Sequence, residues 1–339
     1  MRKLVTLRKV NEIIPINGAD FIELVRVDGW QCVVKKGEFS VGDYGIYFEI
    51  DSLVPLENWS EFLFKTEGEK RKGVFRIKTI KLKNQLSQGL LIPLKALQGK
   101  DLSSAMNVIK YEPPIPSDMS AKSRFPSWIS KTNEERIQNL VNKLEEYSKH
   151  KIYISEKLNG SSLTCYCKKN ELINQYDFGI CSRNLELKLE VENDEGKIVP
   201  SQNRFVDTVR KLGIEEKMRE WCKKNDKDLV IQGELIGDGI QQNNYKFAPN
   251  QKDIRFFTVQ DGKHGILPLS IIQELDLQTV PILETGVYIV NDLNKLLEYA
   301  EGKSVLNNTT EREGIVVRAL DNSFSFKVIS NKFLLKNKE

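Results

Sequence analysis

The sequence is poor in the residues that most often bind metals or shuttle protons. Its 339 residues include two histidines, His150 and His264, and five cysteines without CxxC spacing. We therefore expect neither a disulfide framework nor a structural zinc site, and few residues are available for catalysis by a histidine base. Lysine, arginine and carboxylate side chains must carry the chemistry of this protein.

Long apolar runs are also absent. No run approaches the roughly 18 residues that would predict a membrane span. The N-terminal sequence MRKLVTLRKV is basic, but charge returns too soon for the apolar core of a signal peptide. We expect an intracellular protein, cytoplasmic or nuclear, without membrane association.

The charges are nearly balanced, with 51 basic and 47 acidic residues, but they are not evenly spread. The segment 70–85 holds seven Lys or Arg residues and no acid, interleaved with apolar residues. On a strand, this segment would place Arg76 and Lys78 on one face, as a track for phosphates. An edge strand that carries lysines against aggregation has the same pattern, so both interpretations remain open.

The chain is long enough for two domains. Residues 1–105 show short alternating runs broken by turn signals such as Asp28-Gly29 and Gly42-Asp43, which predict a small antiparallel β-barrel. Residues 106–128 are predicted to be a linker, because 111–128 contain four prolines and little periodicity. Its proline-rich part is expected to be extended.

Residues 129–339 predict a second domain of mixed, mostly antiparallel α+β structure. Thr132 and Glu135 have the spacing of a capping box and predict a helix over 131–150, with an apolar stripe from Ile137 to Tyr147. Further helices are expected at 204–225 and 292–302. Strands are expected at 228–237, 254–262, 312–321 and 323–331.

The stretch YISEKLNGSSLTCY, residues 153–166, contains Asn-Gly between two alternating runs, which predicts a β-hairpin. On its first strand, Ile152 and Ile154 point one way, while Ser155 and Lys157 point the other. From this stretch alone, Lys157 is either a surface lysine or a nucleophile presented at a strand end.

Several short motifs follow Lys157 at expected strand ends or adjoining turns. In chain order they are KLNG (157–160), SRN (182–184), GEL (233–235), RFFTV (255–259), EGIVV (313–317) and FKVIS (326–330). This series resembles the covalent nucleotidyltransferase superfamily of ATP-dependent DNA and RNA ligases and mRNA capping enzymes, over residues 124–332. The resemblance implies that Lys157 attacks the α-phosphate of ATP, forms lysyl-AMP and releases pyrophosphate.

That chemistry makes demands on the surrounding residues. A lysine with an ordinary pKa near 10.4 is protonated at neutral pH, so a cation and a dry site must lower its pKa. Glu234 and Glu313 are the candidate ligands of a hydrated Mg²⁺ or Mn²⁺ ion. Lys327 and Arg183 match the family positions that neutralise charge on the phosphates.

The resemblance extends to further residues. It implies nucleotide contacts from Glu156, Lys157, Asn159, Gly160, Arg183, Glu234, Phe257, Glu313 and Lys327. Phe257 could stack on adenine, with Val259 as the competing choice. The resemblance gives Arg136 a catalytic contact with phosphates, whereas a helix-surface partner is the structural alternative.

Two positions depart from the family pattern. Asn159 stands where many members have an aspartate that orients metal-bound water, so we expect it to serve the metal site through its amide oxygen. Ile329 stands where a second lysine is common. These departures leave open a catalytically inactive RNA-binding relative.

The order of the domains resembles RNA ligases of the Naegleria and Deinococcus type. Nine residues follow Ser330, too few for the OB barrel that follows these motifs in DNA ligases and capping enzymes. The resemblance implies an OB-like N-terminal domain and a nucleotidyltransferase (ATP-grasp-like ligase) domain. It also implies a monomeric ATP-dependent enzyme of RNA repair that joins 3′-OH and 5′-phosphate RNA ends. The sequence leaves open whether these ends belong to a nicked duplex, a tRNA break or a single strand. A DNA ligase or a guanylyltransferase is the alternative.

Overall fold

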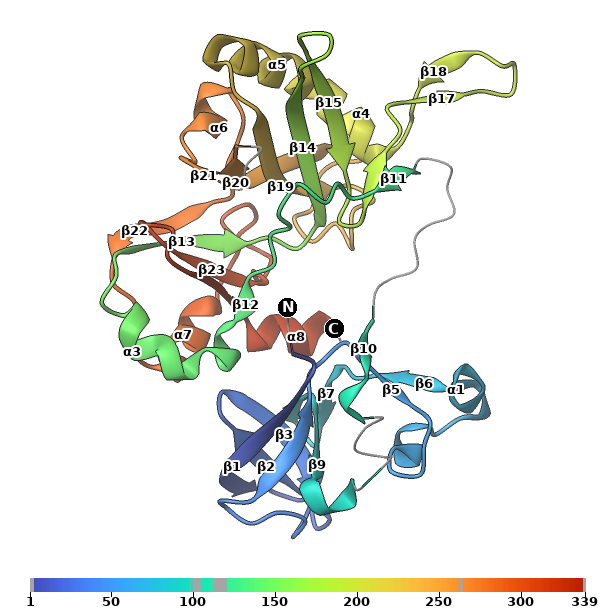
Figure 1. Cartoon of the computed structure of the whole chain (residues 1–339). Helices are drawn as coiled ribbons and strands as arrows, with labels where there is room; N and C mark the ends of the chain where they lie inside the picture. The colour runs from blue at the N-terminus through green and yellow to red at the C-terminus, as the bar shows by residue number, and fades with distance from the viewer. Residues whose placement is uncertain (1–2, 98, 100–104, 112–120, 262–264, 338–339) are drawn as a thin grey trace.

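The computed structural model describes residues 3–97, 99, 105–111, 121–261 and 265–337. Two bodies are evident, a β-rich N-terminal one and a larger C-terminal one of mixed structure (Figure 1). Residues 112–120 stand between the two bodies in the sequence. The proline-rich stretch that was expected to be extended falls in this range and therefore lies outside the described residues. None of the helices in the described ranges is long and apolar enough to cross a membrane.

The N-terminal body is built from antiparallel strands. Its main sheet has the order β3 (Trp30–Lys35), β2 (Ile22–Val27), β1 (Val5–Pro15), β4 (Tyr44–Phe48), β9 (Leu90–Pro93). A second sheet contains β10 (Ile109–Lys110), β5 (Ser52–Pro55) and β6 (Val74–Arg76), and a third pairs β7 (Thr79–Leu82) with β8 (Gln85–Gln88). The Ser87 hydroxyl accepts a bond from the Val33 N–H at 3.0 Å, which closes the curled sheet around a core containing Trp30 and Phe48.

The basic segment 70–85 is not the single strand that its pattern suggested. It begins in α1 (Glu67–Lys72), which Thr66 and Glu69 cap reciprocally and which ends at Gly73 with φ +68°. Strands β6 and β7 follow. Arg76 pairs with Asp51 at 2.6 Å and thus helps to hold its own domain together, while Lys78 is exposed.

The C-terminal body contains two sheets. The seven-stranded sheet has the order β11 (Ala121–Arg124), β16 (Leu185–Leu187), β15 (Gln175–Cys181), β14 (Ser161–Asn170), β19 (Leu229–Gly237), β20 (Lys252–Gln260), β21 (Ile266–Leu267). The five-stranded sheet has the order β12 (Glu135–Arg136), β24 (Ser325–Ile329), β23 (Gly314–Ala319), β13 (Ile152–Lys157), β22 (Ile282–Val287). A small β17 (Glu190–Glu192) and β18 (Ile198–Pro200) hairpin projects from the first sheet (Figure 1).

Helices cover one face of each sheet. Helices α4 (Arg204–Lys211), α5 (Ile214–Asn225) and α6 (Ile271–Glu274) pack on the seven-stranded sheet. Helices α3 (Leu144–Tyr147) and α7 (Leu293–Ala300) pack on the five-stranded sheet. Because strand residues alternate between faces, polar side chains from both sheets remain on the two uncovered faces.

The Asn159-Gly160 turn does not close a hairpin, so that prediction was wrong. Strand β13 pairs with β22 and β23, whereas β14 pairs with β15 and β19. The turn instead carries the chain from one sheet to the other. Alternation on β13 is as predicted, because Ile152 and Ile154 enter the helix-covered core and Lys157 points away from it.

The helix predicted over 131–150 is wrong for most of its length, because the α-helix there covers Leu144–Tyr147 (α3) alone. Glu135 and Arg136 form β12, which runs parallel to β24, and two short 3₁₀ turns lead into α3. The apolar stripe was identified correctly, since Ile137 and Tyr147 are buried on the five-stranded sheet. Backbone hydrogen bonds between β12 and β24 outweigh the local preference of these residues for a helix. Likewise, the helix expected over 204–225 is broken at Gly213, whose φ is +61°.

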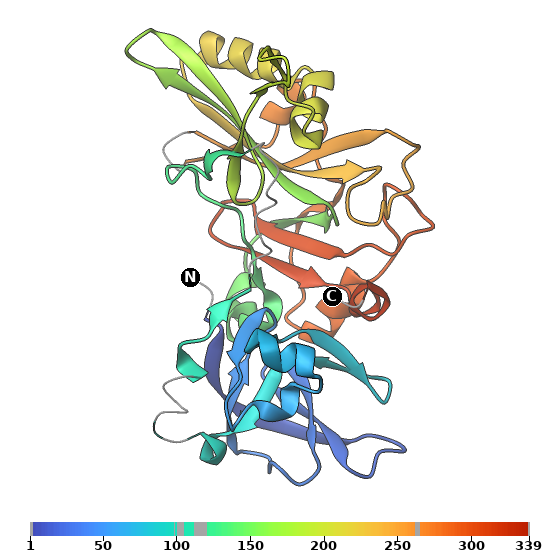
Figure 2. The same cartoon turned by 90° about the vertical axis from the view of Figure 1, so that its right-hand side faces the viewer.

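The two bodies meet through a polar hub and an apolar contact. Asn139 donates to Glu49 at 2.5 Å and accepts from the Trp30 indole at 2.7 Å. Ile329 packs with Leu86 of β8 and with Leu334 of α8 (Asn331–Asn337). Figure 2 shows α8 lying above the N-terminal strands at this junction.

Candidate active site

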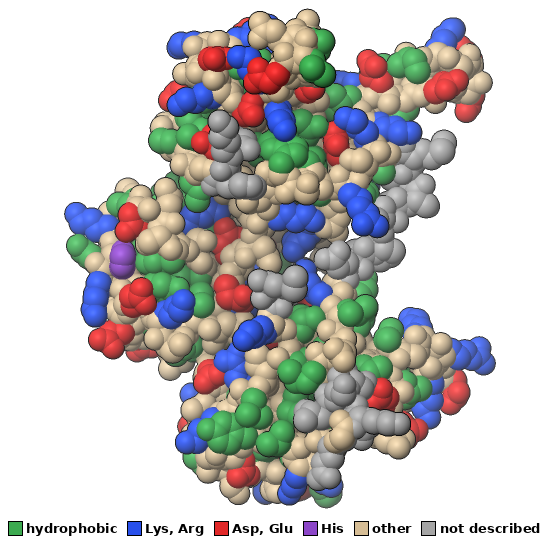
Figure 3. All heavy atoms as spheres, in the orientation of Figure 1, with side chains coloured by type: hydrophobic (Ala, Val, Ile, Leu, Met, Phe, Trp, Pro, Cys, Tyr) green, Lys and Arg blue, Asp and Glu red, His purple; other side chains and the backbone are tan. Residues whose placement is uncertain are grey.

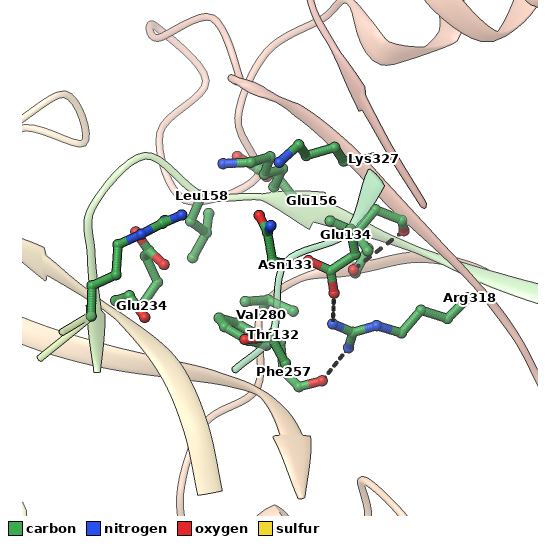
Figure 4. A pocket seen from close by; sticks show the side chains of 15 residues that line it. Thr132, Asn133, Glu134, Glu156, Leu158, Glu234, Phe257, Val280, Arg318 and Lys327 are labelled. Carbon is green, nitrogen blue, oxygen red and sulfur yellow. Dashed lines mark hydrogen bonds and ion pairs between the residues drawn. The ribbon is translucent and has the colours of Figure 1, made fainter. Parts of the chain in front are cut away.

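A cavity lies between the uncovered faces of the two sheets (Figure 4). Strands of both sheets line it, together with the segment that precedes β12. Its lining residues are Thr132, Asn133, Glu134, Ser155, Glu156, Lys157, Leu158, Ser162, Arg183, Glu234, Phe257, Val280, Val316, Arg318 and Lys327. Six of the candidate residues from the sequence therefore meet in one place, although they are spread over more than half of the chain.

Lys157 lies at the end of β13, opposite Gly314 of β23. Its Nζ atom is 2.6 Å from Oε1 of Glu313. Burial alone would lower the pKa of Lys157, but the carboxylates of Glu313 and Glu234 outweigh burial and raise it. The protein groups by themselves thus hold the lysine as an ammonium, the opposite of what nucleophilic attack requires.

Glu234 faces the same cavity from β19. Burial raises its pKa to about 7, Glu313 adds to the increase through like-charge repulsion, and Lys157 opposes it. Two nearby carboxylates offer hard oxygen ligands suited to Mg²⁺ or Mn²⁺. Within the described ranges no group of three or more His, Cys, Asp or Glu side chains could enclose a metal. Two carboxylates alone leave most coordination positions of a Mg²⁺ or Mn²⁺ ion to water.

Asn159 and Gly160 form the crossing between the sheets. The Asn159 N–H donates to the Tyr245 hydroxyl at 2.7 Å, and its side chain is not among those that line the cavity. A Cβ atom on Gly160 would lie 2.4 Å from the Leu235 carbonyl oxygen and 2.7 Å from Cγ of Glu234. The glycine is thus required by the close approach of β19, not by a left-handed turn.

Phe257 lines the cavity, whereas Val259 is buried in the core under the helices. Simple alternation would have put both side chains on one face. The pairing of β19 with β20 shifts between Gln232 and Gly233, and this bulge places Phe257 opposite to Val259. The structure therefore favours Phe257 as the aromatic side chain available to a ligand.

Arg318 and Glu134 form a largely buried ion pair next to Phe257, which the sequence analysis missed. The guanidinium donates to the Glu134 carboxylate and to the Phe257 carbonyl oxygen, and its Cζ atom lies 5.6 Å from the Phe257 ring centroid (Figure 4). Burial would raise the pKa of Glu134, but Arg318 holds it below its ordinary value. The pair fixes the position of the aromatic ring.

Lys327 and Arg183 reach the cavity from β24 and from the turn after β15, respectively. Arg183 is exposed and forms no hydrogen bond or ion pair with any other described residue. The positive charge of Lys327 contributes to the low pKa of Glu134. These two cations approach the cavity from different sheets, and fixed cations of this kind can stabilise charge on a bound phosphate.

Arg136 and Glu156 are placed differently from the expectation. Arg136 is on β12, where its guanidinium lies 5.7 Å from the Trp30 ring centroid and outside the cavity lining. It is therefore not a helix-surface residue. Glu156 lines the cavity, but its carboxylate accepts a bond from the Val305 N–H at 2.8 Å and so anchors a neighbouring loop.

Some residues that line the cavity were not predicted from the sequence, and the sequence patterns that point to them are weak. Arg318 stands two residues after Val316 in the EGIVVRA stretch, so alternation could have placed it beside the cavity. Thr132, Asn133 and Glu134 were assigned to a helix start, which concealed their role as an extended segment along the cavity. Ser162 and Val280 had no distinguishing signal.

Comparisons with known proteins agree with this geometry. A family model described as RNA ligase matches residues 150–332, and an OB-fold domain model matches residues 4–94. Among curated proteins no match was found.

Solved structures of Naegleria gruberi RNA ligase are similar over nearly the whole chain. A lysine-to-methionine variant with AMP and manganese is 35% identical, with a TM-score of 0.82 and 99% of each chain covered. A lysine-to-alanine variant with ATP and manganese gives the same identity, TM-score and coverage. The enzyme with pyrophosphate is 36% identical, with a TM-score of 0.81. The fold, the cavity and these matches together show that this chain belongs to the RNA ligase family.

Proposed function

We propose that this RNA ligase uses ATP to join RNA 3′-OH and 5′-phosphate ends, with Lys157 as the nucleophile. The observation that carries the assignment is the pairing of Lys157 with Glu313 at 2.6 Å, in a cavity that Glu234, Arg183 and Lys327 also line. The solved Naegleria structures with ATP, AMP, pyrophosphate and manganese support the choice of nucleotide and metal.

The reaction has three steps. The Lys157 Nζ atom, after losing its proton, attacks the α-phosphorus of ATP, and the bond to pyrophosphate breaks. An oxygen of the RNA 5′-phosphate then attacks the same phosphorus, the N–P bond breaks, and the lysine regains a proton. Finally, the oxygen of the RNA 3′-OH attacks the phosphorus of the 5′-phosphate and the hydroxyl loses its proton. The P–O bond to AMP breaks, and AMP leaves.

The chain's own residues each have a part in this chemistry. Glu234 and Glu313, with Asn159 through its amide oxygen, would hold a divalent cation, which supplies the positive charge that lowers the pKa of Lys157. Lys327 and Arg183 neutralise the phosphate oxygens as charge develops on them. Phe257, with its position fixed by Arg318, is a stacking surface for adenine.

Three further residues complete the proposed site. Glu156 fixes the strand end that presents Lys157, and Gly160 allows the crossing to lie against β19. Arg136 lies at the junction with the N-terminal domain, where its guanidinium is 5.7 Å from the Trp30 ring centroid. On the family resemblance, we assign it a catalytic contact with phosphates.

We also propose that the enzyme works as a monomer of two domains, residues 1–105 and 129–339, with 106–128 as the linker. Within this range, β10 pairs with β5 of the first domain and β11 pairs with β16 of the second, so the passage from one domain to the other falls between Lys110 and Ala121. The five cysteines are free and buried, which supports a reducing compartment inside the cell. A nicked RNA duplex is the proposed substrate.

Labelling with ATP tests the assignment. Incubation with α-labelled ATP and manganese should leave label on the protein that survives denaturation and alkali and is released by acid, as a P–N bond requires. Both Lys157→Ala and a metal chelator should abolish this label. Lys211→Ala is the matched control, because Lys211 is an exposed helix lysine paired with Asp207. Normal labelling of the Lys157→Ala variant would refute the assignment.

Substrate choice then separates the alternatives. Label from GTP instead of ATP would indicate a guanylyltransferase, and sealing of DNA nicks in preference to RNA nicks would indicate a DNA ligase. RNA binding without any covalent label would indicate an inactive relative.

A further inference from the structure

The face of the seven-stranded sheet that carries no helices is crossed by the segment from Phe125 to Lys131. Tyr166 of β14 points to this face and packs with Ile129 of the crossing segment. Lysine and arginine side chains gather over this face, around apolar side chains (Figure 3). The surface thus combines positive charge with aromatic rings.

Two lysines on this face each make a cation–π contact with an aromatic ring. Lys131 Nζ lies 5.0 Å from the Phe125 ring centroid, and Lys168 Nζ lies 4.7 Å from the Trp128 ring centroid. We call these four residues the lysine–aromatic face. Such contacts hold an ammonium group in place without neutralising its charge.

No carboxylate of the described residues pairs directly with either lysine. Among the described residues neither forms an ion pair, and Lys131 donates to the Asn184 side-chain oxygen at 3.0 Å. Asp177, the cross-strand neighbour of Lys168, accepts instead from Asn170 at 3.1 Å. Both lysines are exposed, so they are available to an external anion.

The aromatic support is rigid. The Tyr166 ring lies directly over Gly179 of β15, where an added Cβ atom would be 2.2 Å from the ring. Its hydroxyl donates to Glu186 at 2.7 Å, and Trp128 packs edge-on against it with ring centroids 5.2 Å apart. The position of Trp128, and with it that of Lys168, is therefore fixed before any ligand binds.

This face continues into the active-site cavity. A second cavity, lined by Phe125, Lys131 and Asn184 among others, shares four lining residues with the first. The shared residues are Thr132, Asn133, Ser162 and Arg183. Arg183 thus stands between the cavity that holds Lys157 and the lysine–aromatic face.

We propose that the lysine–aromatic face binds the RNA strand that carries the 5′-phosphate, a proposal that rests on the ligase function above. In the second step, the 5′-phosphate must reach the phosphorus bonded to Lys157, so its strand must leave the cavity along a continuous surface. Exposed lysines without an ion pair among the described residues suit the backbone phosphates of this strand, and the partly exposed rings of Phe125 and Trp128 suit its bases.

Salt dependence of RNA binding tests this proposal. Full-length wild-type protein, Lys131→Ala, Lys168→Ala and the double variant would be titrated with a 5′-phosphorylated nicked RNA duplex between about 50 and 200 mM salt, without ATP. Each lost phosphate contact should reduce the slope of log K against log salt by roughly 0.7 to 0.9, so the double variant should lose roughly 1.5. Its KM for RNA in sealing should rise about tenfold.

Three readouts keep the two proposals separate. Labelling by ATP needs no RNA and should be unchanged in all three variants, whose altered side chains are exposed. Lys211→Ala on the helix-covered side should change neither the slope nor the KM. A wild-type protein that fails to label would contradict the ligase function. Normal labelling with an unchanged slope in the double variant would overturn the RNA-binding proposal alone.

Discussion

The buried pair of Glu134 and Arg318 leads to a quantitative prediction. Their side chains are 15% and 11% exposed, so solvent screens them little. Removing one partner of a buried pair leaves an uncompensated charge and costs about 3 to 5 kcal/mol. Arg318→Met should therefore reduce the free energy of unfolding by about that amount, and it also removes the bond to the Phe257 carbonyl.

A double-mutant cycle isolates the interaction between the two residues. Glu134→Gln keeps an acceptor for Arg318 but removes the charge, so it should cost about 2 kcal/mol. Because the Glu134→Gln/Arg318→Met double variant no longer buries a lone charge, its loss should be smaller than the sum of the single losses, by about 2 kcal/mol. Urea unfolding followed by circular dichroism measures all four proteins. Single losses below about 0.5 kcal/mol, the range of surface substitutions, would refute the reasoning.

The pH dependence of this pair has a definite sign. Burial would raise the pKa of Glu134, but Arg318 lowers it below the ordinary value near 4.3. Between the two pKa values the unfolded chain binds more protons than the native one, so stability rises with pH there. The contribution of the pair is complete above about pH 5 and is lost as the pH falls through the lowered value. The stability gap between wild type and Glu134→Gln should be constant from about pH 6 to 8 and narrow below about pH 4. A gap that widens on acidification would contradict this assignment.

Two further predictions concern the junctions around the site. Gly160→Ala would place Cβ 2.4 Å from the Leu235 carbonyl oxygen, so the strand crossing must shift, and single-turnover labelling should slow by about a hundredfold. An unchanged labelling rate would show that the crossing can adjust freely. Ile329→Ala should cost about 2 kcal/mol in urea unfolding, because Ile329 is buried against Leu86 of the other domain. A loss below about 0.5 kcal/mol would mean that this contact does not stabilise the domain arrangement.

Local periodicity predicted much of what the structure contains. Alternation in residues 152–157 separated the core side chains Ile152 and Ile154 from Lys157, because a strand's side-chain period is two in any sheet. The helix expected at 292–302 is α7, Leu293–Ala300. The order of short motifs predicted that Lys157, Glu234 and Lys327 share one site, and all three line the same cavity. The strand alternation and the helix depend on residues that are near each other in the sequence. The shared site was predicted from the residue types and the order of the motifs.

Other features could not be predicted, because they depend on which distant strands pair. The turn at Asn159 has the pattern of a hairpin, yet its two flanking strands join different sheets. Phe257 and Val259 should share a face by period, but a bulge against β19 separates them. Glu135 has the spacing of a helix cap, but β24 offers its backbone a partner 191 residues away in the paired residue Phe326.

The sequence by itself determined the residue types and the order of the catalytic motifs, the apolar faces of the strands and the class of chemistry. Only the tertiary structure decided that Glu134 pairs with Arg318 next to Phe257, and that Ile329 joins the two domains. It also brought Phe125 and Trp128 over the open face of β14, next to the cavity. The physical reason is that hydrogen bonding and burial between distant segments, which no local pattern encodes, settle where each side chain lies.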